Sequence, residues 1–104
     1  MTVLYISGPM TGLPELNFPA FHAAADLLRG RGFEVVNPAE INPDPNAAWA
    51  DCLKQDIRAL LDCDGIVMLP GYEGSKGARL ELLIAAELGL RVYSIGDFTI
   101  RAAA

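Results

Sequence analysis

Short apolar runs rich in β-branched residues alternate with segments of helical periodicity along the whole sequence. Four such runs end at turn-forming residues and are expected to be strands, at 3–6, 33–36, 65–69 and 91–95. Apolar residues recur every three or four positions in the three intervals between them, at about 18–30, 49–60 and 76–88. Strands separated by helices indicate a parallel sheet with right-handed crossovers. We therefore expect a three-layer, flavodoxin-like (Rossmann-like) α/β fold with the strand order 2-1-3-4.

Local signals predict how these elements begin and end. Asn17 is placed to cap the first helix, and Ser75 is placed to cap the third. The segment 38–46 holds three prolines and is expected to be loop. Near the end of the chain, Phe98 and Ile100 are candidates for a short fifth edge strand.

The strand order also predicts where a ligand binds. In the order 2-1-3-4 the winding reverses between strands one and three, and ligands bind outside the carboxyl ends of those strands. The loops there are 7–16 and 70–77, the most glycine-rich of the chain. The first part of the loop 7–16 either presents N–H and hydroxyl groups to a phosphate or a sugar, or is simply a turn. This part consists of Ser7, Gly8, Pro9, Met10, Thr11 and Gly12. We expect an anion between this loop and the helix start at Ser75–Gly77, where backbone N–H groups are free.

Three polar side chains near this crevice could carry chemistry. Glu81 has Gly77 four residues before it and Ala85 four residues after it, which leaves an open stripe on the helix. Its carboxylate either reaches a ligand over the helix start or is solvated. Asp56 lies at the edge of an apolar stripe, as a catalytic acid or as a partner of a neighbouring loop. Tyr5 is either core or projects its hydroxyl into the crevice.

Composition narrows the classes of function. A chain of 104 residues corresponds to one domain, 1–104, and its net charge of −5 with no basic block argues against a nucleic-acid duplex as partner. Two cysteines and one histidine are too few for a zinc site, so no metal and no cofactor are expected. No basic segment precedes the first apolar run, and no run approaches the ~18–20 residues that span a bilayer. We expect a cytoplasmic protein without a membrane partner.

Several segments together resemble the nucleoside 2-deoxyribosyltransferase superfamily, which includes the 2′-deoxynucleoside 5′-monophosphate N-glycosidases. The resemblance is greatest to its short bacterial and phage domains of unknown function, and it runs from about residue 3 to residue 95. The most specific segment is Ser75-x-Gly77-x-x-x-Glu81-Leu82-x-x-Ala85, accompanied by Tyr5-Ile6-Ser7-Gly8-Pro9-Met10-Thr11-Gly12 and by Gln55-Asp56.

The resemblance implies a role for each matching position. Glu81 matches the carboxylate that attacks the anomeric carbon, Asp56 the acid beside it, and Tyr5 the tyrosine near the nucleophile. Residues 7–12 and Ser75 match elements that contact phosphate or sugar. Breaking an N-glycosidic bond builds positive charge on the sugar, which a carboxylate stabilises or traps. We expect Glu81, near a helix start, to be ionised and Asp56 to be the protonated partner.

The sequence departs from the superfamily at two places. Many transferases carry an aspartate-rich stretch where this chain has 71–74. In the superfamily a C-terminal segment of a neighbouring subunit often completes the site, and no such segment is identified in the tail of this chain, which ends in 101–104. The expected function is cleavage or transfer at the N-glycosidic bond of a (deoxy)nucleoside or its 5′-monophosphate. The alternatives are a non-catalytic nucleotide-binding or sensing domain and a structural assembly protein. Glu81, Asp56 and Tyr5 together favour an enzyme, since a binding domain needs only the loops.

The chain is also expected to be a homo-oligomer, most simply a homodimer. Trp49, Phe98 and the apolar helix faces exceed what one small sheet can cover. The resemblance points the same way, because members of the superfamily share sites between subunits.

Overall fold

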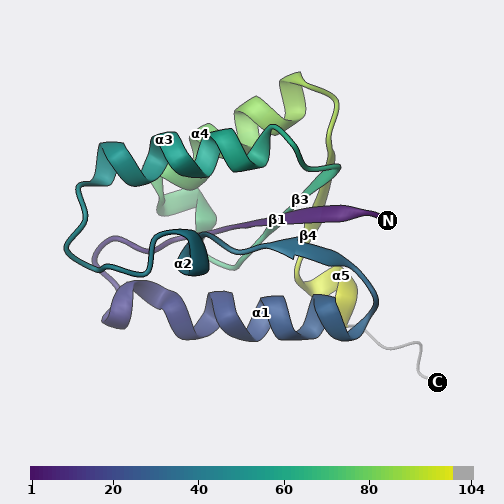
Figure 1. Cartoon of the computed structure of the whole chain (residues 1–104), viewed down its shortest axis with the longest axis horizontal. Coiled ribbons are helices and arrows are strands. Elements are labelled where there is room, and N and C mark those ends of the chain that lie inside the picture. Colours follow the sequence, from purple (N-terminus) through teal and green to yellow (C-terminus); the bar gives the residue numbers. More distant parts are fainter. Residues whose placement is uncertain (100–104) are drawn as a thin grey trace.

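A four-stranded parallel sheet lies at the centre of the computed structural model, which describes residues 1–99 (Figure 1). The strands are β1 (Val3–Ser7), β2 (Glu34–Val36), β3 (Gly65–Met68) and β4 (Arg91–Ser94). They lie in the order β2-β1-β3-β4, and every neighbouring pair is parallel. The α/β class and the strand order expected from the sequence are confirmed.

Helices cover both faces of this sheet. Figure 1 shows α1 (Phe18–Gly30) and α5 (Gly96–Thr99) below it, and α3 (Trp49–Leu60) and α4 (Lys76–Glu87) above it. A short helix, α2 (Pro38–Ile41), follows β2 and packs against both α1 and α3. Among these described helices, none combines the length and the apolarity needed to cross a membrane.

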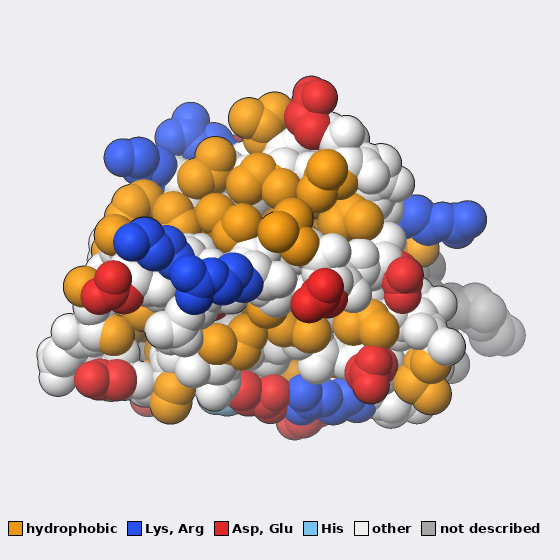
Figure 2. All heavy atoms as spheres, turned by 45° about the horizontal axis from the view of Figure 1, so that its top comes forward, with side chains coloured by type: hydrophobic (Ala, Val, Ile, Leu, Met, Phe, Trp, Pro, Cys, Tyr) orange, Lys and Arg blue, Asp and Glu red, His pale blue; other side chains and the backbone are white. Residues whose placement is uncertain are grey.

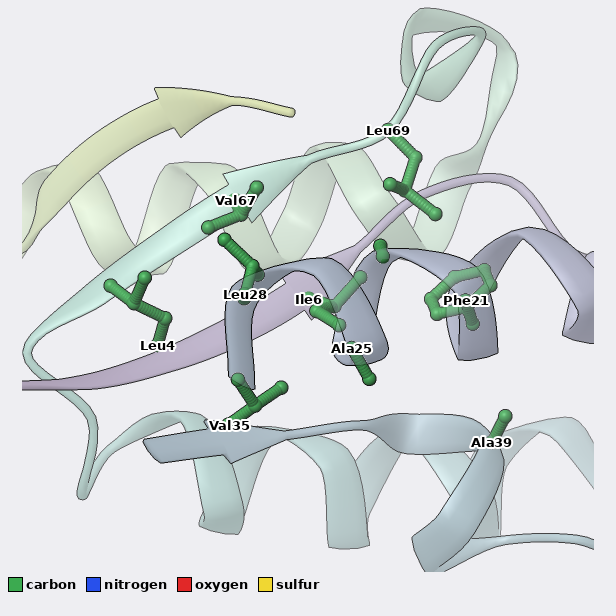
Figure 3. Packing of buried hydrophobic residues seen from close by; sticks show 10 residues of the cluster. Leu4, Ile6, Phe21, Ala25, Leu28, Val35, Ala39, Val67 and Leu69 are labelled. Atoms are coloured by element: carbon green, nitrogen blue, oxygen red, sulfur yellow. The ribbon is translucent and has the colours of Figure 1, made fainter. Parts of the chain in front are cut away.

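The alternation of side chains along β1 divides the core in two. Leu4 and Ile6 face α1, whereas Tyr5 and Ser7 face the layer of α3 and α4, because successive strand residues point to opposite faces. Figure 3 shows the first cluster, in which α1 packs on the strands through Phe21, Ala25 and Leu28. The second cluster contains the Tyr5 ring and consists of Tyr5, Leu60, Cys63, Ile66, Met68, Ala78 and Ala85. The two hydroxyls of β1 therefore lie on the side of Glu81 and Asp56.

The sequence predicted that the proline-rich segment 38–46 is loop throughout. The structure differs, because the helix α2 forms at the start of this segment. Pro38 occupies the first helical position, where its missing N–H is no loss. The side chain of Asn37 accepts a hydrogen bond of 3.0 Å from the N–H of Ala39 and so caps the helix. Pro38, which was counted as a sign of loop, instead begins a helix.

The two predicted caps have different outcomes. Ser75 caps α4, since its Oγ accepts a hydrogen bond of 3.2 Å from the N–H of Ala78. Asn17 does not cap α1 through its side chain; it ends a 3₁₀ turn, η1 (Pro14–Asn17), with a left-handed φ of 61°. Its Nδ2 donates instead to the carbonyl of Pro9 at 2.9 Å, which ties the first loop to the start of α1.

A fifth strand involving Phe98 is not found, because 96–99 is the helix α5. Its first turn is fixed by the side chain of Asp97, which accepts a hydrogen bond of 2.9 Å from the N–H of Ser94. The ring of Phe98 packs against those of Phe33 and Tyr93, at centroid distances of 5.5 and 5.3 Å. The other residue of the expected strand, Ile100, lies outside the described residues, as do 101–104.

Candidate active site

A pocket of about 280 Å³ opens at the carboxyl end of β1, between the first loop, the segment after β2, and the helices α3 and α4. Its walls combine apolar side chains with carboxylates, hydroxyls and an amide; they are Gly8, Met10, Thr11, Leu16, Phe18, Phe21, Pro38, Asn42, Asp44, Pro45, Ala47, Trp49, Cys52, Leu53, Asp56, Ser75, Gly77, Ala78 and Glu81. The first loop lies where the sequence predicted. The segment 38–47 also lines the pocket, whereas the predicted second loop lines it only at its end, through Ser75 and Gly77.

The carboxylate of Glu81 is held by two hydroxyls from β1. Tyr5 donates to its Oε2 at 2.9 Å and Ser7 donates to its Oε1 at 2.7 Å. Only 6% of Glu81 is exposed, so it is not the solvated residue that its helical spacing also allowed. Since Tyr5 and Ser7 are two positions apart on one strand, both hydroxyls reach the same face and fix the plane of the carboxylate.

The pKa of Glu81 differs from the value expected for it. Burial raises the pKa to about 7, although the hydrogen bonds from Ser7 and Tyr5 favour the ionised form; the nearby charge of Asp56 raises it further. The prediction that a helix start keeps Glu81 ionised is wrong, because the residue lies beyond the first turn of α4, to which the dipole effect is confined. At pH 7 roughly half of the molecules carry this charge. Burial also raises the pKa of Tyr5 well above its ordinary value, so its hydroxyl remains a donor.

Asp56 brings a second carboxylate to the same pocket from α3. It is buried, and its Oδ1 accepts a hydrogen bond of 2.9 Å from Nδ2 of Asn42. Burial raises its pKa to about 6, and the bond from Asn42 opposes that rise. Burial therefore raises the pKa values of both carboxylates of the pocket toward neutrality in the ligand-free molecule.

The remaining residues of the predicted site fall into three groups. Five of them line the pocket: Gly8, Met10, Thr11, Ser75 and Gly77. Pro9 and Gly12 do not line it, and Ser7 lies behind Glu81. Gly8 is needed for a packing reason, since a Cβ there would lie 2.7 Å from Cβ of Leu69.

Sequence reasoning missed several wall residues as site residues, among them Asn42 and Trp49. Asn42 lies in the segment that was interpreted as plain loop; the signal that could have found it is the shared edge of parallel strands, which places the end of β2 beside the end of β1. Trp49 was interpreted as core or interface, yet it lines the pocket and is 46% exposed. The ammonium of Lys76 lies 5.2 Å from the centre of its ring, and the indole borders Gly77.

The chemistry available in this pocket is that of paired carboxylates. Within residues 1–99, no three His, Cys, Asp or Glu side chains gather closely enough to hold a metal ion. Glu81 and Asp56 face the pocket from two different helices, with pKa values that both lie near neutrality. Such a pair can divide the roles of nucleophile and proton donor between its members.

Comparisons with known proteins agree with this architecture. Residues 2–94 match the model of a family described as "Domain of unknown function (DUF4406)". Among solved structures, a 2-deoxyribosyltransferase from Bacillus psychrosaccharolyticus superposes with a TM-score of 0.69 at 22% identity, over 89% of this chain and 71% of that one. A 2-desoxiribosyltransferase from Leishmania mexicana gives 0.70 at 20% identity, over 90% of this chain and 63% of that one.

These likenesses are likenesses of fold. The chain spans 71% of the Bacillus psychrosaccharolyticus protein and less than two thirds of the Leishmania mexicana protein. Both structures therefore have parts without a counterpart here. A search of the curated proteins finds no match.

Proposed function

The chain belongs to the DUF4406 family, a domain of unknown function, and we propose that it cleaves or transfers the N-glycosidic bond of a deoxynucleoside or deoxynucleoside 5′-monophosphate. The observation that carries the proposal is the buried carboxylate of Glu81, oriented by the hydroxyls of Tyr5 and Ser7 in a pocket that also holds Asp56. A domain that only binds a nucleotide has no need of a desolvated carboxylate pair. The fold shared with the two 2-deoxyribosyltransferases supports the same reaction class.

The proposed reaction is a double displacement on Glu81. The C1′–N bond breaks and its electron pair leaves with the base, while a carboxylate oxygen of Glu81 forms a bond to C1′. Asp56 in its protonated form gives its proton to the leaving base. Water or a second base then attacks C1′, the ester bond to Glu81 breaks, and the proton released by the attacking group returns to Asp56. Positive charge on the sugar favours ionised Glu81 as the bond breaks.

The first loop and the start of α4 are proposed to hold the sugar and any 5′-phosphate. Thr11 supplies a hydroxyl, and Ser75 and Gly77 stand where α4 begins, with all three lining the pocket. A helix start offers free N–H groups and about half a positive charge to such a group. Titration with inorganic phosphate, followed through the backbone amide NMR signals, tests this placement; perturbed signals confined to another face of the molecule contradict it.

The experiment that tests the function is release of free base. Wild-type protein is incubated with a panel of deoxynucleosides and their monophosphates, and the products are separated by chromatography. Glu81→Gln and Glu81→Ala are expected to abolish base release while binding persists, because the substitutions remove the nucleophile and not the pocket. Glu87→Gln, an exposed glutamate on the same helix, is the matched control. If the wild type binds a deoxynucleotide but releases no base from any of them, the chain is a sensing domain. If Glu81→Gln is fully active, another residue does the chemistry.

We also propose that the protein is a homo-oligomer, formed with a second copy through the outer face of α4. Leu80 and Leu83 are exposed on α4, with 57% of Leu83 open to solvent, and Leu88 is exposed just after the helix ends. Figure 2 shows hydrophobic side chains gathered on the face formed by α3 and α4. Phe98 does not support this proposal, because its partly buried ring packs against Phe33 and Tyr93 of the same chain. Contiguous apolar surface of this kind is typical of an interface.

A further inference from the structure

The amide of Asn42 links two consecutive elements of the site, α2 and α3. Nδ2 of Asn42, at the end of α2, donates to Oδ1 of Asp56 on α3 at 2.9 Å. This is the hydrogen bond that the carboxyl of Asp56 makes within residues 1–99. The opposite orientation of the amide would set an oxygen of Asn42 against a carboxylate oxygen, two acceptors with no proton between them. The donor is therefore the nitrogen whenever Asp56 is ionised.

Hydrogen bonds and an ion pair hold the short helix that carries Asn42 against its neighbours. Its backbone N–H donates to the carbonyl of Pro38 at 2.9 Å, which closes α2. Arg29 of α1 pairs with both carboxylate oxygens of Glu40 on α2, at 2.8 Å each, and also donates to the carbonyl of Val35. This forked ion pair ties α2 to α1 and to the end of β2. Asn42 is thus presented from an anchored element and not from a free loop.

We propose that Asn42 is a positioning residue: it reserves Oδ1 of Asp56 as a hydrogen-bond acceptor, so that the proton given to the leaving base is carried on Oδ2. The assignment of that proton to the leaving base rests on the proposed function, whereas the coupling of Asn42 to Asp56 does not. A carboxyl proton placed on one defined oxygen is aimed in one direction, which general acid catalysis requires. The acceptor on the base is then a ring nitrogen or a carbonyl oxygen that faces Oδ2.

The other titratable groups around Asp56 cannot replace this hydrogen bond. Glu81 from α4 and Asp44 from the segment after α2 line the same pocket, and both are acidic. The hydroxyl of Tyr5 from β1 is already donated to Glu81, and the thiol of Cys52 from α3 is only a weak donor. No lysine, arginine or histidine is among the described residues that line the pocket. Removal of the Asn42 amide therefore leaves the ionised form of Asp56 without its donor, and its pKa rises further.

The test follows the titration of Asp56 itself, in ligand-free protein labelled with ¹³C at aspartate carboxyls and assigned with Asp56→Asn. In Asn42→Ala the midpoint is expected to move upward by about one pH unit, the effect of one hydrogen bond to a charged group. Asn42→Asp is expected to move it further, because it replaces the donor by a like charge. Asn46→Ala, an exposed asparagine of the same segment, is the matched control and leaves the midpoint unchanged.

Activity supplies the second readout. The fall of kcat/KM on the alkaline side, where the form with protonated Asp56 is lost, is expected to shift upward in Asn42→Ala. A midpoint in Asn42→Ala equal to that of the wild type overturns the proposal, whatever the activity. Should the alanine variant not fold, Asn42→Ser answers the same question. If the midpoint shifts but the wild type releases no base, the coupling stands and the proposed function fails.

Discussion

Removal of the hydroxyl of Tyr5 is expected to weaken catalysis by changing the charge of Glu81. Tyr5→Phe deletes one donor at 2.9 Å from Oε2 and leaves the fully buried ring in place. The bond from Ser7 remains, so the carboxylate loses one of two donors. The pocket walls are unchanged because Tyr5 lies behind Glu81 and does not line the pocket.

The size of the effect follows from the titration of Glu81. A hydrogen bond to a charged group contributes ~1.5 kcal/mol, which is about one pKa unit. The pKa of Glu81 then moves from about 7 to roughly 8. At pH 7 the ionised fraction falls from about one half to about one tenth, so kcat/KM falls by about fivefold. The deficit grows below pH 7 and closes as the pH approaches 9, where Glu81 is ionised in both proteins.

The assay is kcat/KM for base release from pH 5 to pH 9. Tyr93→Phe makes the same change on β4, where the ring packs on Phe98, and serves as the control. Two results refute the reasoning: Tyr5→Phe with the rates of the wild type at every pH, or a deficit of the same size at pH 6 and at pH 9. The second result points to a geometric effect without a change in the charge of Glu81.

Other predictions concern stability and assembly. Burial raises the pKa of Glu81 from 4.5 to about 7, so its stabilising contribution is complete below pH 4.5 and is lost as the pH rises through 7. In urea unfolding at pH 8, Glu81→Gln should therefore have a free energy of unfolding higher than that of the wild type by up to ~3 kcal/mol, and at pH 4 it should show no such gain. Gly8→Ala should lose about 1–3 kcal/mol in thermal or urea unfolding because its Cβ meets Leu69, whereas Gly74→Ala, with open space around it, should change stability by less than ~0.5 kcal/mol. Light scattering should show an oligomer that Leu83→Glu shifts toward the monomer; a monomeric mass at every concentration contradicts the proposed interface.

Much of the fold could be predicted because its signals are local. The strand β1 ends at a glycine-rich turn, and its alternation alone places Tyr5 and Ser7 on one face. Ser75 caps α4 through its own side chain, a contact between residues three apart. The strand order follows from the alternation of elements and the handedness of crossovers.

The parts that could not be predicted depend on contacts between distant segments. The spacing around Glu81 allowed either a solvated or a buried side chain; the bonds from Tyr5 and Ser7, more than seventy residues away, decide between them. Its pKa depends on how completely α4 buries it, which periodicity does not report. Asn42 was missed because α2 forms at a proline and because its partner, Asp56, lies on another helix.

The most direct test of a covalent role for Glu81 is intact-mass spectrometry of protein quenched with acid during turnover of a deoxynucleoside. The proposed displacement predicts a population heavier by one deoxyribosyl group, with the added mass on the peptide that contains Glu81 and absent in Glu81→Gln. Base release by the wild type with the added mass on a different residue, or undiminished release by Glu81→Gln, contradicts it.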